Sequence, residues 1–511
     1  MAARFRSFVR QPVLDRLVLI GVVALAAVLR LVNLPARGMW DADQGHDMLV
    51  LRALIRAGEV PLLGPPTSIG DFHHGVLYYY LLAPSAALSG ADPVAIAATI
   101  AIAGVAAVAV TWWLARAIGG SVAGAVAGLL MAVSASAIDE SIFIWNPNLI
   151  ALSSSIALAA AWRAWTTGRA AWWVVAGIGA IVTMHCHVLG AILLPPIAAL
   201  WVAAVRRPDG GGDVARAGLV VVVLLVASYV PLAIHEVGGD FSETRALLAF
   251  VAGGGEPSTM ALPARLLIIG LRVLAWPLAG LVTNAPAAAL LAAAFVVAVL
   301  VWRARAATGT ERTATRWFAG TLAWTILALT VAASGLATVI PRLPNDHYHA
   351  FADPIVFVVA GLGVAAIARW RPTGGTQPIG RALAGVLVVV IAAFNLATQP
   401  PQTAPDGGWP AARTAAARVI AAADAGPLEL QSLPEFKSGE ALEFPLVAAG
   451  ATVRPAGADG VTRVVLCDAL FEAAIGARCG GPAEDAATAG SGRQLVDRFE
   501  AAPGRWVSVY H

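Results

Sequence analysis

Long apolar segments follow one another along most of the chain and are separated by short polar stretches. The segments are continuous rather than alternating, which predicts α-helices and disfavours a transmembrane β-barrel. A membrane-spanning helix needs about 20 predominantly apolar residues, and segments of nearly this length recur from residue 14 to residue 398. By this criterion the pattern predicts about 11 spans: residues 14–34, 94–115, 121–138, 148–165, 171–187, 188–205, 217–235, 285–302, 317–340, 352–368 and 382–398.

Two further apolar segments, residues 76–89 and 262–283, are ambiguous. Loops on the cytoplasmic side of a membrane carry an excess of arginine and lysine. If neither segment crosses completely, the arginine clusters between Arg116 and Arg381 all lie on the side of the N-terminus. If both cross, the clusters from Arg116 to Arg216 move to the opposite side. We therefore interpret both segments as re-entrant or interfacial helices, with about 13 spans as the alternative.

The N-terminal region resembles an uncleaved signal-anchor, because four arginines accompany a long apolar segment and no clear cleavage site follows it. The chain is therefore expected to be a multi-pass protein of the plasma membrane, with a cytoplasmic N-terminus and an extracytoplasmic C-terminal region. On this topology most of the unusual polar residues lie on the outer face. Chemistry is expected there, because ionisable residues at membrane depth are costly and commonly functional.

The composition changes after residue 398. Residues 399–410 are rich in proline, glycine and glutamine, which is typical of a linker. Residues 411–511 then predict a small soluble α/β domain with an alanine-rich helix at 411–425. Its strands are expected at residues 428–432, 462–467, 494–500 and 506–510. The expected fold class is thus an all-α polytopic membrane domain, residues 1–398, followed by a small extracytoplasmic α/β domain.

Cys467 and Cys479 both lie in this C-terminal domain. An extracytoplasmic location would permit a disulfide between them, and a free pair is the alternative. The third cysteine, Cys186, lies in an apolar segment.

Composition and charge agree with a membrane protein. Hydrophobic residues make up 59% of the chain and charged residues 13%, whereas about 25% of a typical soluble domain is charged. The net charge of +3 is scattered along the chain, so no surface for nucleic acid is predicted.

The most unusual polar stretch lies in the first extracytoplasmic loop, residues 35–75. A positioned carboxylate can accept the proton of a hydroxyl nucleophile as it attacks an anomeric carbon. The Asp-x-Asp spacing also occurs in metal–nucleotide sites of soluble sugar transferases, but no Rossmann-like domain surrounds it here. A solvated surface turn or a helix cap is the structural alternative. The stretch contains three carboxylates and one histidine: Asp41, Asp43, His46 and Asp47.

The same loop ends in His73, His74 and three consecutive tyrosines that begin at Tyr78. Histidines at a membrane interface can hydrogen-bond to a phosphate or bind a metal. Adjacent histidines on one helix point in different directions, so a metal site would need ligands from elsewhere. The tyrosines are also typical of an interfacial aromatic belt.

Further polar clusters lie between later spans on the same face. A histidine at membrane depth often only hydrogen-bonds to a neighbouring helix, and an Asn-Pro pair can separate two helices. An arginine beside histidines, however, is a suitable clamp for a lipid-linked phosphate. The candidate substrate-binding residues are His46, Arg52, Arg56, His73, His74, Tyr78, Asp139, Glu140, Asn146, His185, His187, Arg342, His347 and Tyr348.

Several short segments together resemble one known family. They are Asp43-Gln44-Gly45-His46-Asp47, Pro61–Gly70, Leu77–Leu82, Ile144–Leu149 and His347-Tyr348. They resemble the GT-C glycosyltransferases, in particular the protein O-mannosyltransferase and aminoarabinose–lipid A transferase group, in a bacterial branch similar to glycosyltransferase family 39. The resemblance extends over about residues 14–370 and is most specific over residues 14–150.

The resemblance implies an inverting transfer of a sugar from a polyprenyl phosphate to an acceptor on the outer face. It implies that Asp43 is the acidic catalytic residue, with arginine and histidine side chains near the phosphate. The family's Asp-Glu pair is Asp43-Gln44 here, which leaves Asp41 or Asp47 as the second carboxylate. Gly75 and Val76 replace the two prolines that follow the histidine in the family, which loosens the start of the next helix.

The implied partners are a polyprenyl-phosphate-linked sugar donor, membrane lipids and a lipid, glycan or protein acceptor. No cofactor is certain, and a divalent metal ion is left open. A transporter or lipid flippase is the alternative function, although no internal repeat is evident and the polar residues favour one face over the membrane midplane. An inactive homologue with a scaffold role is the other alternative, because Gln44 replaces a family carboxylate.

Overall fold

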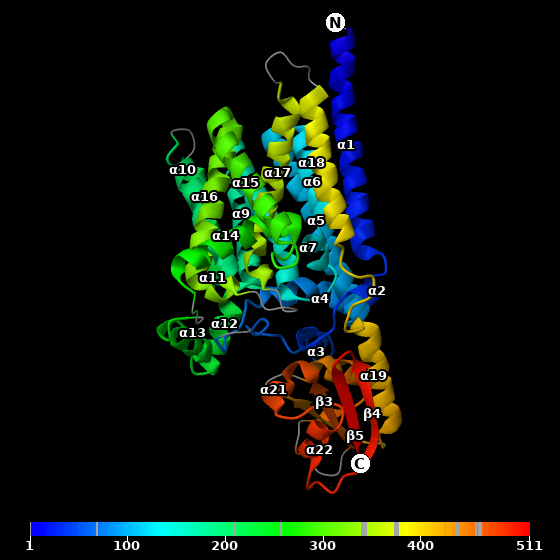
Figure 1. Ribbon diagram of the computed structural model, residues 1–511. Coiled ribbons are helices and arrows are strands. Elements are labelled where there is room, and N and C mark those ends of the chain that lie inside the picture. Colours follow the sequence, from blue (N-terminus) through cyan, green and yellow to red (C-terminus); the bar gives the residue numbers. More distant parts are fainter. Residues whose placement is uncertain are drawn as a thin grey trace.

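The computed structural model describes residues 2–67, 70–207, 211–255, 258, 260–338, 345–371, 378–424, 426–435, 439–454, 457 and 462–511. A helical bundle and a C-terminal domain are stacked end to end, and the layer that contains α3 lies between them (Figure 1). The N-terminal end of α1 and the C-terminal domain lie at opposite ends of the bundle. The predicted fold class, an all-α membrane domain followed by a small α/β domain, is confirmed.

The bundle consists of long apolar helices. Eight described helical segments are long and apolar enough to cross a membrane, so the chain is a multi-pass membrane protein. The bundle elements are α1 (Ala2–Leu31), α5 (Pro93–Gly119), α6 (Ser121–Val133), η1 (Asn146–Leu149), α8 (Ile150–Thr167), α9 (Ala171–Cys186), η2 (Val188–Leu193), α10 (Leu194–Val205), α11 (Gly211–Ser228), α12 (Val230–Gly238), α14 (Leu262–Ala279), α15 (Pro286–Ala306), α16 (Gly309–Ala332), η4 (Asp346–Ala352), α17 (Asp353–Arg369) and α18 (Pro378–Ala397).

The two ambiguous apolar segments differ in length. Helix α4 (Leu77–Ser89) has 13 residues, too few to cross a hydrocarbon core of about 30 Å at 1.5 Å per residue. Helix α14 has 18 residues and is among the segments that are long enough to cross. Its length therefore departs from the expectation of a re-entrant or interfacial segment.

Helix α17 forms the centre of the bundle. Every residue from Asp353 to Ala366 is buried. At Gly361 an added Cβ would lie 2.4 Å from the carbonyl oxygen of Ala123 on α6. Small residues allow such close approach of helices in a membrane, where the hydrophobic effect does not drive helices together.

Short elements form the layer at the end of the bundle that faces the C-terminal domain. They are α2 (Leu34–Arg37), α3 (Ala42–Ala57), α4, α7 (Ala135–Asp139), α13 (Ser242–Ala252) and η3 (Ser334–Ala337). Helix α3 begins at a capping box, in which the side chains of Asp41 and Gln44 bond to each other's backbone N–H groups. It ends at Gly58, whose φ of 71° is the left-handed conformation that glycine adopts readily.

The C-terminal domain contains a five-stranded sheet with the strand order β2-β1-β3-β5-β4. The strands β2, β1 and β3 are parallel, whereas β5 pairs antiparallel with β3 and β4. The predicted strands correspond to four of these five, and the short β2 was missed. The elements of the domain are α19 (Gly408–Ala422), β1 (Leu428–Leu433), α20 (Glu440–Ala448), β2 (Val453–Arg454), β3 (Thr462–Asp468), η5 (Ala469–Phe471), α21 (Glu472–Ile475), α22 (Pro482–Thr488), β4 (Leu495–Ala502) and β5 (Arg505–Tyr510).

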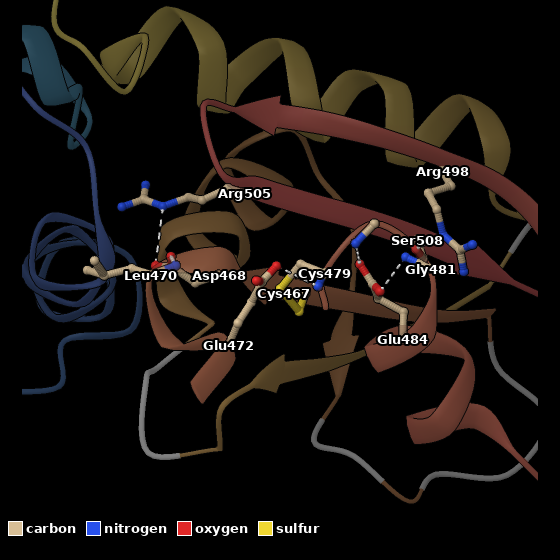
Figure 2. Close-up of a disulfide and its surroundings, with 11 residues drawn as sticks. Cys467, Asp468, Leu470, Glu472, Cys479, Gly481, Glu484, Arg498, Arg505 and Ser508 are labelled. Atoms are coloured by element: carbon tan, nitrogen blue, oxygen red, sulfur yellow. Dashed lines mark hydrogen bonds and ion pairs between the residues drawn. A yellow bond between two sulfur atoms is a disulfide. The ribbon is translucent and has the colours of Figure 1, made fainter. Parts of the chain in front are cut away.

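A disulfide joins Cys467 at the end of β3 to Cys479 in the loop before α22, so the disulfide alternative holds over the free pair (Figure 2). Beside it, Arg505 faces Asp468 with its Nε 3.9 Å from a carboxylate oxygen. Cys186 is a buried free thiol in the bundle.

Candidate active site

A cavity of about 390 Å³ lies between α3 and the adjacent end of the bundle. Its walls come from segments that are far apart in the sequence, and eight of the predicted site residues line it. The lining residues include Asp43, His46, Asp47, His74, Asn146, His187, His347 and Tyr348, together with Phe72, Trp145, Phe250 and Glu440.

One wall of the cavity is a single face of α3. Asp43, His46 and Asp47 are spaced three and four residues apart, so they share this face of the helix. Asp43 is exposed, His46 is half-buried and Asp47 is 2% exposed. The Nδ1 atom of His46 lies 2.9 Å from a carboxylate oxygen of Glu440.

Asp47 is held by two tyrosine hydroxyls. Tyr78 donates to its Oδ2 at 2.7 Å, and Tyr79 donates to its Oδ1 at 2.9 Å. Burial raises the pKa of Asp47 to about 7, although both hydrogen bonds oppose that rise. Both carboxylate oxygens are thus already engaged, and Asp47 ties α3 to the start of α4.

Three histidines from three separate segments also line the cavity. The ring centroids of His74 and His187 are 4.7 Å apart, and those of His187 and His347 are 5.4 Å apart. The Nδ1 atoms of His74 and His187 accept hydrogen bonds from the backbone N–H groups of Val188 and Leu189, each at 3.3 Å. When Nδ1 accepts, a neutral imidazole carries its proton on Nε2. These histidines can therefore present Nε2–H donors to an anion.

The charge state of His74 agrees with this role. Burial, together with the neighbouring His73, lowers the pKa of His74 to about 4. His74 is therefore a neutral hydrogen-bond donor at pH 7, and it does not add a positive charge to the cavity.

Gly75 has a steric role beside these histidines. A Cβ at this position would lie 1.9 Å from Nδ1 of His185 and 2.7 Å from its Cα atom. The backbone N–H of Gly75 also donates to the carbonyl of His185 at 3.0 Å. The departure from the family's proline therefore allows α9 to pack directly against the segment that carries His74.

Substitution of Gly75 tests this packing. We expect Gly75→Ala to destabilise the protein by about 1–3 kcal/mol, because the methyl group has no space and the backbone must shift. Thermal unfolding of the detergent-solubilised protein measures the effect. Gly320→Ala is the matched control, because nothing lies within 4 Å of its Cβ position, and it should leave stability nearly unchanged. Equal stability of the two variants would contradict this packing.

Several predicted site residues lie away from the cavity. Asp41 caps α3 and lies 3.0 Å from Arg505 as an ion pair. Arg52 is 3.5 Å from the carbonyl of Val447, and Arg56 is exposed.

Two other candidate residues, His73 and His185, do not line this cavity. His73 pairs with Glu243 at 3.0 Å, and His185 lies 2.9 Å from the hydroxyl of Ser228. His73 and His185 line a second cavity of about 180 Å³.

Three further candidates, Tyr78, Asp139 and Glu140, do not line the cavity. Tyr78 contacts Asp47 from behind the lining. Asp139 is exposed, and Glu140 lies near Asp353. Arg342 lies outside the described residues.

A buried ion pair that was not predicted from the sequence supports the cavity. Arg272 of α14 binds Asp346 through two nitrogens, at 2.9 and 2.5 Å, and both side chains are 1% exposed. Arg272 also donates to Asn345 at 2.7 Å and to the carbonyl of Leu336. Asp346 directly precedes His347 and Tyr348, so this pair fixes the segment that carries them. The signal was Arg272 in the middle of an apolar segment, because a charged residue in such a segment commonly has a specific partner.

Among the described residues, no group of three or more histidine, cysteine, aspartate or glutamate side chains is arranged to hold a metal ion. The cavity lining supplies carboxylate and imidazole groups.

The chain is similar to one protein family and to several solved structures. Residues 73–232 match the family described as dolichyl-phosphate-mannose-protein mannosyltransferase. The structure of ArnT from Cupriavidus metallidurans bound to undecaprenyl phosphate is similar, with a TM-score of 0.62 and 15% identity over 96% of this chain and 97% of that chain. The chain has a GT-C fold.

This GT-C fold extends over nearly the whole chain. The apo structure of ArnT from Cupriavidus metallidurans gives a TM-score of 0.61 at 16% identity, over 96% of this chain and 97% of that chain. The structure of an oligosaccharyltransferase from Archaeoglobus fulgidus in complex with Zn and sulfate gives a TM-score of 0.53 at 15% identity, over 89% of this chain and 68% of that chain. No curated protein sequence matches. The predicted resemblance to GT-C glycosyltransferases is confirmed, because the matched family and these similar structures are of glycosyltransferases.

Proposed function

We propose that this GT-C protein moves a sugar from a polyprenyl-phosphate donor to an acceptor on the outer face of the plasma membrane, with inversion at the anomeric carbon. One observation carries the proposal. A single cavity brings the carboxylate of Asp43 together with the imidazoles of His74, His187 and His347 from three other segments. Base and anion-binding groups in one cavity are what such a displacement requires.

The reaction assigns roles to the carboxylate and to the histidines. Asp43 accepts the proton of an acceptor hydroxyl while that oxygen attacks the anomeric carbon. The bond between the anomeric carbon and the phosphate oxygen breaks, and the polyprenyl phosphate leaves with the electron pair. The Nε2–H groups of His74 and His187 stabilise the charge that develops on the phosphate. Asp43 is favoured over Asp47 as the base, because both oxygens of Asp47 already accept tyrosine hydroxyls.

The proposed outer-face location is supported by two features. The disulfide between Cys467 and Cys479 is typical of an oxidising compartment, which supports a location of the C-terminal domain outside the cytoplasm. From the cavity, α10 and α17 lead away toward Arg206 and Arg369 at their other ends. Arginine-bearing ends are expected in the cytoplasm, so the cavity and the C-terminal domain would share the outer face.

The proposed partners are a polyprenyl-phosphate-linked sugar, membrane lipids and an acceptor that is a lipid, glycan or protein. The family match and the structural likeness to ArnT bound to undecaprenyl phosphate support this donor class. The same likeness favours an enzyme over a transporter or lipid flippase.

Purified protein tests the proposal directly. Incubated with a polyprenyl-phosphate sugar, it should transfer the sugar to an added acceptor or hydrolyse the donor, and release polyprenyl phosphate. If the protein instead moved the intact lipid between the leaflets of a vesicle without cleaving it, the flippase alternative would replace this proposal. If it did neither, the scaffold alternative would stand.

A further inference from the structure

A carboxylate of the C-terminal domain lies in the wall of the cavity. Among the described residues of that domain, Glu440 alone lines it. Its Oε1 atom lies 2.9 Å from Nδ1 of His46. The side chains of His46 and Glu440 are 30% and 26% exposed, so they form a pair at the cavity surface rather than in the protein core. Because Nδ1 of His46 is engaged, Nε2 is the atom of this ring that can contact a substrate.

Backbone packing fixes the position of Glu440. A Cβ on Gly45 would lie 2.1 Å from the carbonyl oxygen of Glu440 and 2.8 Å from the backbone nitrogen of Ala441. Helix α20 therefore crosses α3 with backbone against backbone, and only glycine leaves room for this contact. The glycine directly precedes His46, so the crossing point and the paired side chains are neighbours in the sequence.

A second group of contacts anchors the domain beside this crossing. Trp40 is 3% exposed, and its ring centroid lies 4.7 Å from that of Trp409. Its indole N–H donates to the carbonyl of Ala441 at 2.8 Å. Arg505 donates to the carbonyl of Trp40 at 2.7 Å and pairs with Asp41 at 3.0 Å. A buried aromatic ring with a satisfied polar atom is a rigid anchor, so α20 is held over α3 in a fixed register.

The charges that face His46 come from both helices. Asp43 and Asp47 lie on α3, and Glu440 and Glu443 lie on α20. Burial lowers the pKa of His46, but the hydrogen bond and charge of Glu440, with the charges of Asp47 and Asp43, raise it by more. The net pKa lies above the usual value, so His46 keeps its proton to a higher pH than an ordinary histidine does.

We propose that Glu440 is a positioning residue of the transfer reaction, which orients His46 toward the acceptor beside Asp43 and makes the C-terminal domain part of the active site. The inference rests on the proposed function and deepens it. The protonated ring would donate its Nε2–H to an oxygen of the acceptor, while Asp43 takes the proton of the attacking hydroxyl. The C-terminal domain then has a direct role in acceptor placement, which its sequence did not indicate.

Steady-state transfer by the full-length protein from a polyprenyl-phosphate sugar tests this inference. We expect Glu440→Gln to lower kcat/KM by about 10- to 100-fold, which is the range expected for a misplaced reacting group. The alkaline limb of its pH profile should move to lower pH, because His46 then loses its proton more readily. His46→Gln, and the double variant that combines it with Glu440→Gln, should lose about as much kcat/KM as Glu440→Gln alone, because Glu440 acts through His46. Additive losses, or an unchanged pH profile, would overturn the inference.

A control separates this effect from general damage to the domain. Asp497→Asn breaks the ion pair with Arg418 in the same domain, away from the cavity, and should leave kcat/KM and the pH profile unchanged. A wild-type protein that transfers no sugar would refute the proposed function. An active wild type whose Glu440→Gln variant behaves like Asp497→Asn would refute this inference alone.

Thermal unfolding gives a readout that does not depend on activity. A histidine whose pKa is raised in the folded state adds stability below its unfolded pKa, and this contribution is lost as pH rises through the folded pKa. The difference in the free energy of unfolding between wild type and Glu440→Gln should therefore be larger at pH 5.5 than at pH 8.5. The first pH lies about one unit below an ordinary histidine pKa, and the second lies about two units above it. A difference that does not change with pH would contradict the pairing.

Discussion

Asp43→Asn is expected to lower the kcat of sugar transfer by about 10²- to 10⁴-fold, the usual contribution of a general base. The substitution keeps the size of the side chain and removes its ability to take a proton. Because Asp43 is exposed on the cavity face of α3, folding should be little affected. Initial rates of polyprenyl phosphate release from a polyprenyl-phosphate sugar measure the loss.

The matched control for this substitution is Asp71→Asn. Asp71 is an exposed aspartate of the same loop that does not line the cavity, and its φ of 52° is tolerated by asparagine. The Asp71→Asn variant should be as active as the wild type. Full activity of Asp43→Asn would show that another group accepts the proton, and Asp47 would then be the next candidate.

Arg272→Met is expected to be the most damaging change to stability, at about 3–5 kcal/mol, because it leaves the buried carboxylate of Asp346 without its cation. The loss should reach the cavity, since Asp346 directly precedes His347. The thermal stability of the protein and its affinity for the donor should therefore fall together. Unfolding in detergent and titration with polyprenyl phosphate measure the two effects.

Two further variants test whether the lost stability comes from the unpaired buried charge. Arg216→Met breaks an exposed ion pair with Asp213, whose side chains are 83% and 76% exposed, and should change stability by less than about 1 kcal/mol. Adding Asp346→Asn to Arg272→Met should recover part of the lost stability, because the unpaired buried charge is removed. A double variant less stable than Arg272→Met would contradict the assignment of the loss to that charge.

The membrane bundle was predictable because hydrophobicity over about 20 residues is a strong and local signal. The helices at residues 93–119 and 286–306, for example, follow directly from their apolar runs. The segment at 262–283 was interpreted as re-entrant or interfacial from the distribution of the loop arginines, and no partner was predicted for Arg272. Its cation is satisfied by Asp346, 74 residues further along the chain, and no local pattern reveals a partner at that distance.

The candidate site was predicted in part. Asp43, His74 and His347 were chosen for their chemistry and their shared side of the membrane, and the structure places them around one cavity. Arg52 and Arg56 were chosen for charge alone. The direction in which a helix presents a side chain depends on what packs against it, and here α3 turns these arginines away from the cavity.

The contribution of the C-terminal domain could not be predicted from the sequence. His46 and Glu440 are separated by 394 residues, and their contact depends on a backbone crossing at Gly45. The structure also explains Gln44, which departs from the family pattern. Its side chain caps α3 and donates to the carbonyl of Ile144 at 2.7 Å, so it helps to hold Asp43 in place.

A structure of the Asp43→Asn variant with a bound polyprenyl-phosphate sugar would test the central claim most directly. We expect the anomeric carbon beside residue 43, and a phosphate oxygen within hydrogen-bond distance of Nε2 of His74 or His187. The glycosidic oxygen should face the histidines, so that an acceptor can approach from the side of α3. A donor whose phosphate lies outside this cavity, or on the same side of the sugar as residue 43, would contradict the account.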